Sequence, residues 1–351
     1  MNLSFYKGKK VFITGHTGFK GSWMCKVLAM HGAEVMGYAL NPNTDPSLFK
    51  IAEIESAITH VIGDICDLKH MKTAMSEFEP EIVIHMAAQP LVRESYKDPV
   101  YTYATNVMGT VNVCESVRCC NSVKSFINVT TDKVYENKEW EWGYRESDRL
   151  NGFDPYSNSK SCSELVTSSY INSFFSHREN LAVSTCRAGN VIGGGDFAKD
   201  RIIPDCVRAA HKKEDIIIRN PYSTRPYQHV LEPVVSYLYI GMMMYQDRKY
   251  AGNYNIGPND IDCVETGVLA TLFCDKWGEG QKWVNVCENK AVHEANFLKL
   301  DIAKVKKKFG IEPHWNIAES IEKTVEWSKA YYNGEDIYAV MEKQISAYLG
   351  V

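Results

Sequence analysis

The sequence contains no CxxC pair, and its eleven cysteines are an odd number. Two of them, Cys119 and Cys120, are adjacent, which is poor geometry for a zinc site or for a simple disulfide bridge. An odd cysteine count in a chain of 351 residues favours reduced thiols in a reducing compartment. We therefore expect no metal centre and a cytoplasmic location.

Segments that would direct the chain to a membrane or to nucleic acid are also missing. The first residues, "MNLSFYKGKKVFITGHTG", lack the apolar core of a signal peptide. No apolar run reaches the roughly 18 residues that a membrane-spanning helix needs. The net charge is −4, without a long basic run, whereas binding of nucleic-acid phosphates needs clustered Lys and Arg. We expect neither a membrane nor a nucleic acid as partner.

What the sequence does contain is a regular alternation of strand and helix patterns. Buried-strand patterns occur at Lys10–Thr14, Glu34–Leu40, Thr59–Ile65, Glu81–Ala88 and Ser125–Thr131. Helical patterns lie between them at Gly18–Gly32, Asp67–Phe78 and Asp98–Cys120. Parallel strands need crossover helices, so this order predicts an α/β fold with a doubly wound parallel sheet. Ligands of such sheets bind beyond the carboxyl ends of the strands.

The regular pattern weakens after about residue 190, where loops such as "GNVIGGGDFAKD" and "NPYSTRPYQH" interrupt shorter elements. We predict a nucleotide-binding domain over 1–190 and a smaller, mainly substrate-binding lobe over 191–351. The boundary is soft, and the chain is allowed to cross between the lobes more than once.

The segment "TGHTGFKG" places glycines between the first strand and the first helix. Such glycines permit a tight turn, a close approach of a pyrophosphate and close helix packing, and the helix N-terminus attracts phosphate. The spacing is GxxGxxG, so a plain turn is the alternative, but the position favours a dinucleotide. The predicted cofactor-binding residues of this turn are Gly15, His16, Thr17, Gly18, Phe19, Lys20 and Gly21.

Discrimination between NAD and NADP is open, because the second strand ends in "YALNPN" without an acidic residue. Asn41 can hydrogen-bond a ribose hydroxyl, and Lys20 is the nearby cation. Asp64, followed by Ile65, is placed to meet the adenine amine or to form a turn. Further cofactor candidates follow the fourth strand at Ala87, Ala88 and Gln89.

The segment "PYSNSK" places Tyr156 and Lys160 four residues apart, on one face of a helix. A lysine ammonium beside a phenol favours the phenolate and lowers the tyrosine pKa. Such a tyrosine can take a proton from a substrate alcohol while hydride leaves for a nicotinamide, and the lysine can also hold the nicotinamide ribose.

Taken in order, "TGHTGFKG", "GDI", "HMAAQ", "NVMGT", "VTTDKVYE" and "YSNSK" resemble the extended short-chain dehydrogenases/reductases, which have a Rossmann-type fold. Over nearly the whole chain, segments such as "ENKEWEWGYRE" and "RPYQHVLEP" resemble the CDP-glucose 4,6-dehydratase branch. The resemblance implies NAD as cofactor and CDP-glucose as substrate. It also implies a product CDP-4-keto-6-deoxyglucose and a place in deoxysugar and O-antigen lipopolysaccharide biosynthesis.

The resemblance also assigns roles after the fifth strand. Tyr156 would remove the proton of the 4-hydroxyl, and Thr131 would orient that hydroxyl. Asp132 would act as the acid and Lys133 as the base of the following elimination. A lysine base needs a depressed pKa, which burial and nearby positive charge can supply. The alternative for this pair is a solvated turn that closes a strand.

The remaining candidates can bind the substrate, but most of them also fit an ordinary structural role. Arg225 and His229 resemble the diphosphate-facing segment of the family, against a surface salt bridge for the arginine. Asn190 is placed by resemblance between nicotinamide and sugar, against an Asx turn. Gln89 and Arg93 lie at the predicted cleft edge and can meet ribose or sugar. For Asn106 we expect a structural role, and for "EWEWGY" the packing of a lid.

Two other classes of protein fit parts of this pattern. A sugar-nucleotide 4-epimerase needs Tyr156 and Lys160 but not Asp132 or Lys133. A non-catalytic NAD-binding protein has no need of a tuned phenol. The helices Asp98–Cys120 and Tyr156–Phe175 resemble the pair that forms a four-helix dimer interface in the family, so a homodimer or homotetramer is expected.

Overall fold

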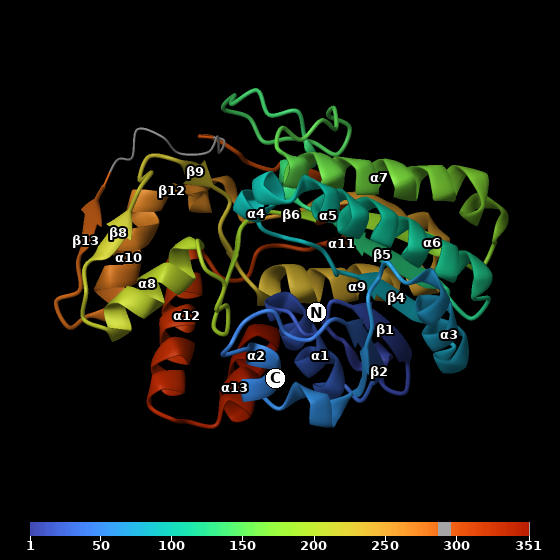
Figure 1. Ribbon diagram of the computed structural model, residues 1–351, viewed down its shortest axis with the longest axis horizontal. Coiled ribbons are helices and arrows are strands. Elements are labelled where there is room, and N and C mark those ends of the chain that lie inside the picture. Colours follow the sequence, from blue (N-terminus) through green and yellow to red (C-terminus); the bar gives the residue numbers. More distant parts are fainter. Residues whose placement is uncertain (287–295, 351) are drawn as a thin grey trace.

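The computed structural model describes residues 1–286 and 296–350 and is built around a seven-stranded parallel sheet (Figure 1). Its strand order is β3-β2-β1-β4-β5-β6-β11. The doubly wound α/β fold predicted from the sequence is therefore confirmed. The strands are β1 (Lys10–Thr14), β2 (Glu34–Ala39), β3 (Thr59–Ile62), β4 (Ile82–His85), β5 (Ser125–Val129), β6 (Ala182–Ala188) and β11 (Gly252–Ile256).

The order of the strands reverses between β1 and β4, because β2 follows β1 outward on one side and β4 pairs with it on the other. Such a reversal opens a crevice beyond the carboxyl ends of the two strands. The turn at Gly15 follows β1 directly and therefore lies at this crevice.

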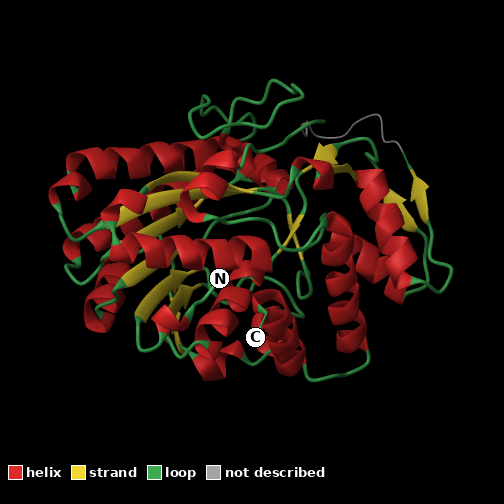
Figure 2. Cartoon of the chain, turned by 180° about the vertical axis from the view of Figure 1, so that it is seen from behind, coloured by secondary structure: helices red, strands yellow, loops and turns green. Residues whose placement is uncertain are grey.

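Helices cover both faces of the sheet (Figures 1 and 2). Strand β1 shows why: Val11 and Ile13 enter one apolar cluster with α1 and α9, whereas Phe12 enters the other with α3 and α6. The helices on one face are α1 (Phe19–Met30), α9 (Leu231–Gln246) and α13 (Ile337–Leu349). Those on the other are α3 (Leu68–Phe78), α6 (Gly109–Cys119) and α7 (Pro155–Ser173), with the shorter α4 (Val92–Lys97) and α5 (Pro99–Tyr103) at one end.

A smaller lobe lies beside the sheet, at the left of Figure 1, and has an apolar cluster of its own. It contains α8 (Ile202–His211), α10 (Thr266–Trp277) and α12 (Ile317–Tyr332). Two short strand pairs complete it: β8 (Ile216–Ile218) with β13 (Trp283–Asn285), and β9 (Thr224–Arg225) with β12 (Val264–Glu265). A third pair, β7 (Val191–Ile192) with β10 (Gln228–His229), leads out of the large sheet.

The chain returns to the large sheet after residue 190, because β11 pairs with β6 and α9 contacts β5 and β6. The domain boundary at residue 190 stays a prediction, with this crossing as its observed context. The helix expected over Asp98–Cys120 is divided: α5 and α6 are joined by a π-helical turn, η3 (Ala104–Met108). Asp98 caps the N-terminus of α5, since its side chain accepts a hydrogen bond from the Tyr101 amide.

All ten cysteines in the described part of the chain are free thiols. Among residues 1–286 and 296–350 there is also no helix that is both long and apolar enough to cross a bilayer.

Candidate active site

The turn after β1 has the shape of a phosphate cradle, and its three glycines differ in what they do. Gly15 has φ +79°, and a Cβ there would lie 2.7 Å from the amide nitrogen of Ala87. A Cβ at Gly21 would lie 2.3 Å from the Gly15 carbonyl oxygen, so both positions need glycine for packing. A Cβ at Gly18 would meet only that oxygen, at 3.5 Å. The bare backbone at Gly18 and the following N-terminus of α1 fit a pyrophosphate.

Two side chains of this turn are used by the protein itself. Thr17 donates its hydroxyl to the carbonyl oxygen of Leu40 at 2.9 Å, which ties the turn to the end of β2. His16 is fully buried, with its Nε2 atom 2.6 Å from Nδ1 of His60. Burial and the neighbouring His60 lower the pKa of His16 to about 3, so its ring is neutral at physiological pH. The predicted contact of His16 with a cofactor would therefore be made by its backbone and not by its ring.

The predicted adenosine contacts lie after the ends of β2 and β3, and some of them already form hydrogen bonds within the protein. Asn41 is exposed beyond β2, as a ribose ligand would be. Asp64 accepts a hydrogen bond from the Cys66 amide at 2.8 Å, so one carboxylate oxygen forms a turn. The carbonyl oxygen of Ile65 accepts a hydrogen bond from Asn112 at 2.9 Å. The contacts of these residues with adenine or ribose stay predictions.

Beyond β4, the polar group of Gln89 is turned into the protein. Its side-chain nitrogen donates to the Thr102 hydroxyl at 2.9 Å, and its side-chain oxygen accepts from the Leu91 amide at 2.6 Å. The Gln89 amide is held by Asn106, whose side-chain nitrogen also donates to Ser159 on α7. Asn106 is thus the structural prop that the sequence indicated. The side chain of Gln89 has a structural role as well, and the structure offers no support for a contact with sugar.

The end of β5 and the start of α7 bring the predicted reaction centre together. Lys160 is buried and donates to the carbonyl oxygen of Val129 at 3.2 Å. Burial, and next the nearby Lys20, lower the pKa of Lys160 to about 7. Tyr156 stands one turn earlier on the same face of α7.

The expected lowering of the Tyr156 pKa by Lys160 is wrong for the chain as it stands. Burial is the largest effect and raises the phenol pKa to about 12, while a hydrogen bond with Thr131 lowers it in part. The negative charge of Asp132 raises it further. The physical reason is desolvation, which sequence spacing does not report.

Asp132 and Lys133 are paired with each other. Lys133 Nζ lies 3.0 Å from Asp132 Oδ1 and 3.1 Å from Asn190 Oδ1. The Thr131 hydroxyl donates to the same Asp132 oxygen at 2.9 Å. The Asp132 side chain is 1% exposed, and its other oxygen, Oδ2, has no hydrogen-bond partner among the described residues. The pair is therefore not a solvated turn, although the Lys133 side chain keeps 28% of its surface exposed.

An arginine that the sequence analysis missed acts on the same centre. The positive charge of Arg201 lowers the pKa of Tyr156, and burial together with Arg201 lowers the pKa of Lys20 to about 8. Asp196 holds Arg201, with Nη1 and Oδ2 3.0 Å apart. No motif around Arg201 signalled this role, because it depends on the fold of the loop before α8. Excess positive charge here suits ligands that carry diphosphates.

The remaining predicted substrate ligands lie in different places. Arg93 on α4 forms an ion pair with Asp200 at 3.2 Å, which links the large lobe to the loop before α8. Arg225 is buried in β9, and its Nη1 donates to the Thr224 carbonyl at 3.0 Å. His229 is fully buried, and its ring packs against the rings of Trp23 and Trp315. A direct contact of His229 with a diphosphate has no support in this packing.

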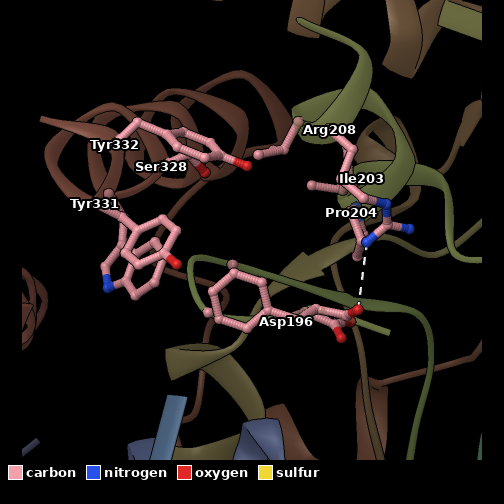
Figure 3. A pocket seen from close by; sticks show the side chains of 12 residues that line it. Asp196, Ile203, Pro204, Arg208, Ser328, Tyr331 and Tyr332 are labelled. Atoms are coloured by element: carbon pink, nitrogen blue, oxygen red, sulfur yellow. Dashed lines mark hydrogen bonds between the residues drawn. The ribbon is translucent and has the colours of Figure 1, made fainter. Parts of the chain in front are cut away.

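A small cavity lies behind the loop that carries Asp196 (Figure 3). Tyr331 and Tyr332 of α12 face Ile203 and Pro204 of α8 across it. Its volume of about 20 Å³ has room for about one water molecule and none for a sugar nucleotide. The cavity belongs to the packing of this loop against α8 and α12.

Comparison with known proteins agrees with this arrangement. A family model described as GDP-mannose 4,6 dehydratase matches residues 12–324. A CDP-glucose 4,6-dehydratase of Salmonella typhimurium is 46% identical over 99% of this chain and 98% of its own length. A dTDP-glucose 4,6-dehydratase of Streptomyces antibioticus is 28% identical over 78% of this chain and 77% of its own length.

Solved structures share the fold at lower identity. The dTDP-glucose 4,6-dehydratase of Bacillus anthracis in complex with NAD has a TM-score of 0.77 and 19% identity, over 93% of this chain and 99% of that one. The UDP-glucose 4-epimerase of Stenotrophomonas maltophila with bound NAD has a TM-score of 0.81 and 18% identity, also over 93% of this chain and 99% of that one. The same scaffold thus occurs in a dehydratase and in an epimerase.

Proposed function

This chain belongs to the GDP-mannose 4,6-dehydratase family, and from that premise we propose that it converts CDP-glucose into CDP-4-keto-6-deoxyglucose and water. The observation that carries the proposal is the ion pair of the buried Asp132 with the partly exposed Lys133 at the end of β5, beside Tyr156. An elimination across two neighbouring sugar carbons needs an acid and a base side by side. The choice of CDP-glucose rests on the 46% identity to the Salmonella typhimurium dehydratase.

The cofactor in this proposal is NAD, held by the turn Gly15–Gly21 and by Lys160. The open backbone at Gly18 and the positive charges of Lys20 and Lys160 fit its diphosphate and ribose. When bound, NAD would supply the hydride acceptor for C4 and the hydride donor for C6. The buried ammonium of Lys160, fixed on the Val129 carbonyl, would orient the ribose through its remaining donors.

In the first step, Tyr156 takes the proton of the substrate 4-hydroxyl. Thr131 lies beside the phenol, where it lowers the Tyr156 pKa, and it can orient both groups. The positive charge of Arg201 favours the phenolate, and so does that of a bound cationic ring, against the desolvation that raises the pKa.

In the second step, Lys133 takes the C5 proton and Asp132 protonates the departing 6-hydroxyl. In the ion pair, the lysine is protonated and the aspartate is deprotonated, which is the reverse of what a base and an acid need. A single proton transfer along the 3.0 Å contact from Nζ to Oδ1 turns the lysine into a base and the aspartate into an acid. Asn190, which also binds Nζ, keeps the amine oriented during this transfer. Lys133 finally returns a proton to C5.

The test is incubation with CDP-, dTDP-, UDP- and GDP-glucose, followed by mass measurement for loss of water. CDP-glucose labelled with deuterium at C4 should give product labelled at C6, and reaction in heavy water should label C5. An epimerase would return the label to C4 without loss of water, and a simple dehydrogenase would transfer it to free NADH. Either result would overturn the proposal.

We further propose a homodimer or homotetramer in the cytoplasm. Apolar side chains are exposed along α5, η3 and α7, among them Val100 (79%), Met108 (54%) and Leu165 (57%). A second copy that packs on this surface would cover them. The ten free thiols support a reducing compartment.

A further inference from the structure

An ion pair lies buried directly behind the reaction centre and takes no part in the mechanism above. Glu164 on α7 and Arg187 on β6 have side chains that are 2% and 1% exposed. Arg187 donates from Nε to Oε1 and from Nη2 to Oε2, both at 2.9 Å. A buried pair carries a desolvation cost that apolar residues of the same size would avoid. Its presence therefore calls for a role beyond stability.

Each partner of this pair holds one end of the catalytic segment Thr131–Lys133. The residue before the segment, Thr130, donates its hydroxyl to Glu164 Oε1 at 2.5 Å. On the far side, after the short helix η4 (Asp132–Val134), the phenol of Tyr135 accepts from Arg187 Nη1 at 2.8 Å.

The anchor at Tyr135 is itself fixed to the sheet. Its phenol donates to Asn255 Oδ1 on β11 at 2.6 Å. Asn255 in turn donates to the carbonyl oxygens of Tyr144 and Asp301. The ring of Tyr135 stacks on that of Tyr144 with centroids 5.2 Å apart. The second end of the segment is thus held as firmly as the first.

We propose that the Glu164–Arg187 pair is a positioning device that clamps the segment Thr131–Lys133 at both ends. This inference rests on the proposed function, because its purpose is to keep Asp132 and Lys133 aligned with C6 and C5 during the elimination. The segment leaves the sheet at Thr130, whose amide still bonds to the Cys186 carbonyl. Backbone pairing resumes beyond the segment, where Tyr135 forms an antiparallel bridge with Leu150. The side-chain anchors at Thr130 and Tyr135 add to this backbone pairing on both sides of the place where two proton carriers must act together.

Helix α7 unites both halves of the site. Tyr156, Lys160 and Glu164 are spaced four residues apart, so one helix face carries the base of the oxidation, the ligand of the ribose and the clamp. Movement of the clamp would shift Asp132 and Lys133, which serve only the elimination, relative to Tyr156 and Lys160 on α7. Loss of an anchor should therefore slow loss of water more than it slows oxidation.

The test uses Thr130→Val, which removes one hydrogen bond to Glu164 and leaves the ion pair intact. The matched control is Thr185→Val, because Thr185 donates to Glu164 Oε2 at 2.6 Å but lies on β6, outside the segment. Rapid mixing with CDP-glucose gives two rates, formation of enzyme-bound NADH and release of water. A displacement of about 1 Å can cost about 100-fold in rate. We expect Thr130→Val to slow water loss by about 10- to 100-fold and to slow NADH formation less, because Thr131 is the one residue of the segment that also serves the oxidation.

The second anchor gives an independent test. Tyr135→Phe removes the link to Arg187 and keeps the ring. Its control is Tyr254→Phe on β11. This change removes a phenol that donates to the Tyr250 carbonyl oxygen at 2.6 Å. Hydrogen exchange at the amides of Thr131–Tyr135 should accelerate in Thr130→Val and Tyr135→Phe, and not in either control. This readout needs no turnover.

The outcomes separate the two proposals. If the wild-type protein releases no water from any nucleotide sugar, the proposed function fails, and hydrogen exchange then decides whether the clamp exists. If the wild-type protein turns over but Thr130→Val and Thr185→Val change both rates alike, with equal exchange, the clamp is overturned.

Discussion

Replacing Asp132 with Asn should divide the reaction at its midpoint. The carboxylate accepts from Thr131 and Lys133 on Oδ1, and an amide oxygen can accept the same two bonds. The new NH2 group takes the place of Oδ2, which has no partner among the described residues. An unpaired buried donor costs about 1–3 kcal/mol, within the stability of a domain of this size. We therefore expect Asp132→Asn to fold.

The two chemical steps should respond differently to this change. Asp132 raises the pKa of Tyr156, so removing its charge does not disfavour the phenolate that starts the oxidation. The elimination loses its acid, and general acid catalysis contributes about 10²- to 10⁴-fold. This corresponds to about 3–5 kcal/mol of barrier. Oxidised sugar that still carries its 6-hydroxyl should accumulate with reduced cofactor on the enzyme.

The assay is rapid mixing of NAD-loaded enzyme with CDP-glucose. The absorbance of the reduced nicotinamide reports the first step, and mass analysis of quenched samples reports loss of water. Asp200→Asn, at an exposed carboxylate that pairs with Arg93, serves as control and should leave the order of the two steps unchanged. Wild-type dehydration by Asp132→Asn would refute the acid role. A variant that forms no NADH would refute the division of labour between Tyr156 and Asp132.

Three further changes probe the oxidation half of the site. Tyr156→Phe should lower turnover by at least about 100-fold while NAD binding, measured by calorimetry, stays intact, since only the base is lost; an active variant would exclude Tyr156 as the base. Because the pKa of Lys160 is lowered to about 7, its ammonium form is lost as pH rises through that value, and NAD affinity of the cofactor-free protein should fall there. A titration of Lys160→Met should show no such fall. Gly15→Ala should lower both the melting temperature and the NAD affinity, because Gly15 has φ +79° and a Cβ there would lie 2.7 Å from the Ala87 nitrogen. Gly8→Ala should lower the melting temperature alone, because Gly8 also has a positive φ but nothing lies within 4 Å of its Cβ.

Local patterns in the sequence predicted the fold well. The strand Lys10–Thr14 has the predicted bounds, and Asp67 caps α3 by accepting from the His70 amide at 3.0 Å. Strand bounds and helix caps depend on residues that are close together in the sequence, so the local sequence pattern predicts them. The helix expected over Asp98–Cys120 contains a π-helical turn instead, and the contact of Asn106 with Gln89 there joins residues 17 positions apart.

The direction and environment of side chains could not be predicted in the same way. The sequence marked Gln89 after the fourth strand, and the resemblance marked His229 in a diphosphate-facing segment. The orientation of both side chains depends on partners such as Thr102 and Trp315, and Trp315 is distant from His229 in the chain. The pKa of Tyr156 likewise follows from how closely the whole site packs around the phenol. Arg201 and the clamp at Glu164 became visible only once the loop before α8 and strand β6 were placed.

The late return of the chain to the large sheet has a consequence for biosynthesis. When residue 190 has left the ribosome, six strands exist, but β6 still lacks its neighbour β11. The part of the apolar face that α9 later covers, with Ile127 and Val129 of β5, is bare until that helix emerges. A nascent chain in this state exposes both an unpaired strand edge and an apolar surface, and both favour aggregation. Its yield in the cell therefore depends on the speed of translation through the second half and on chaperones that shield the first.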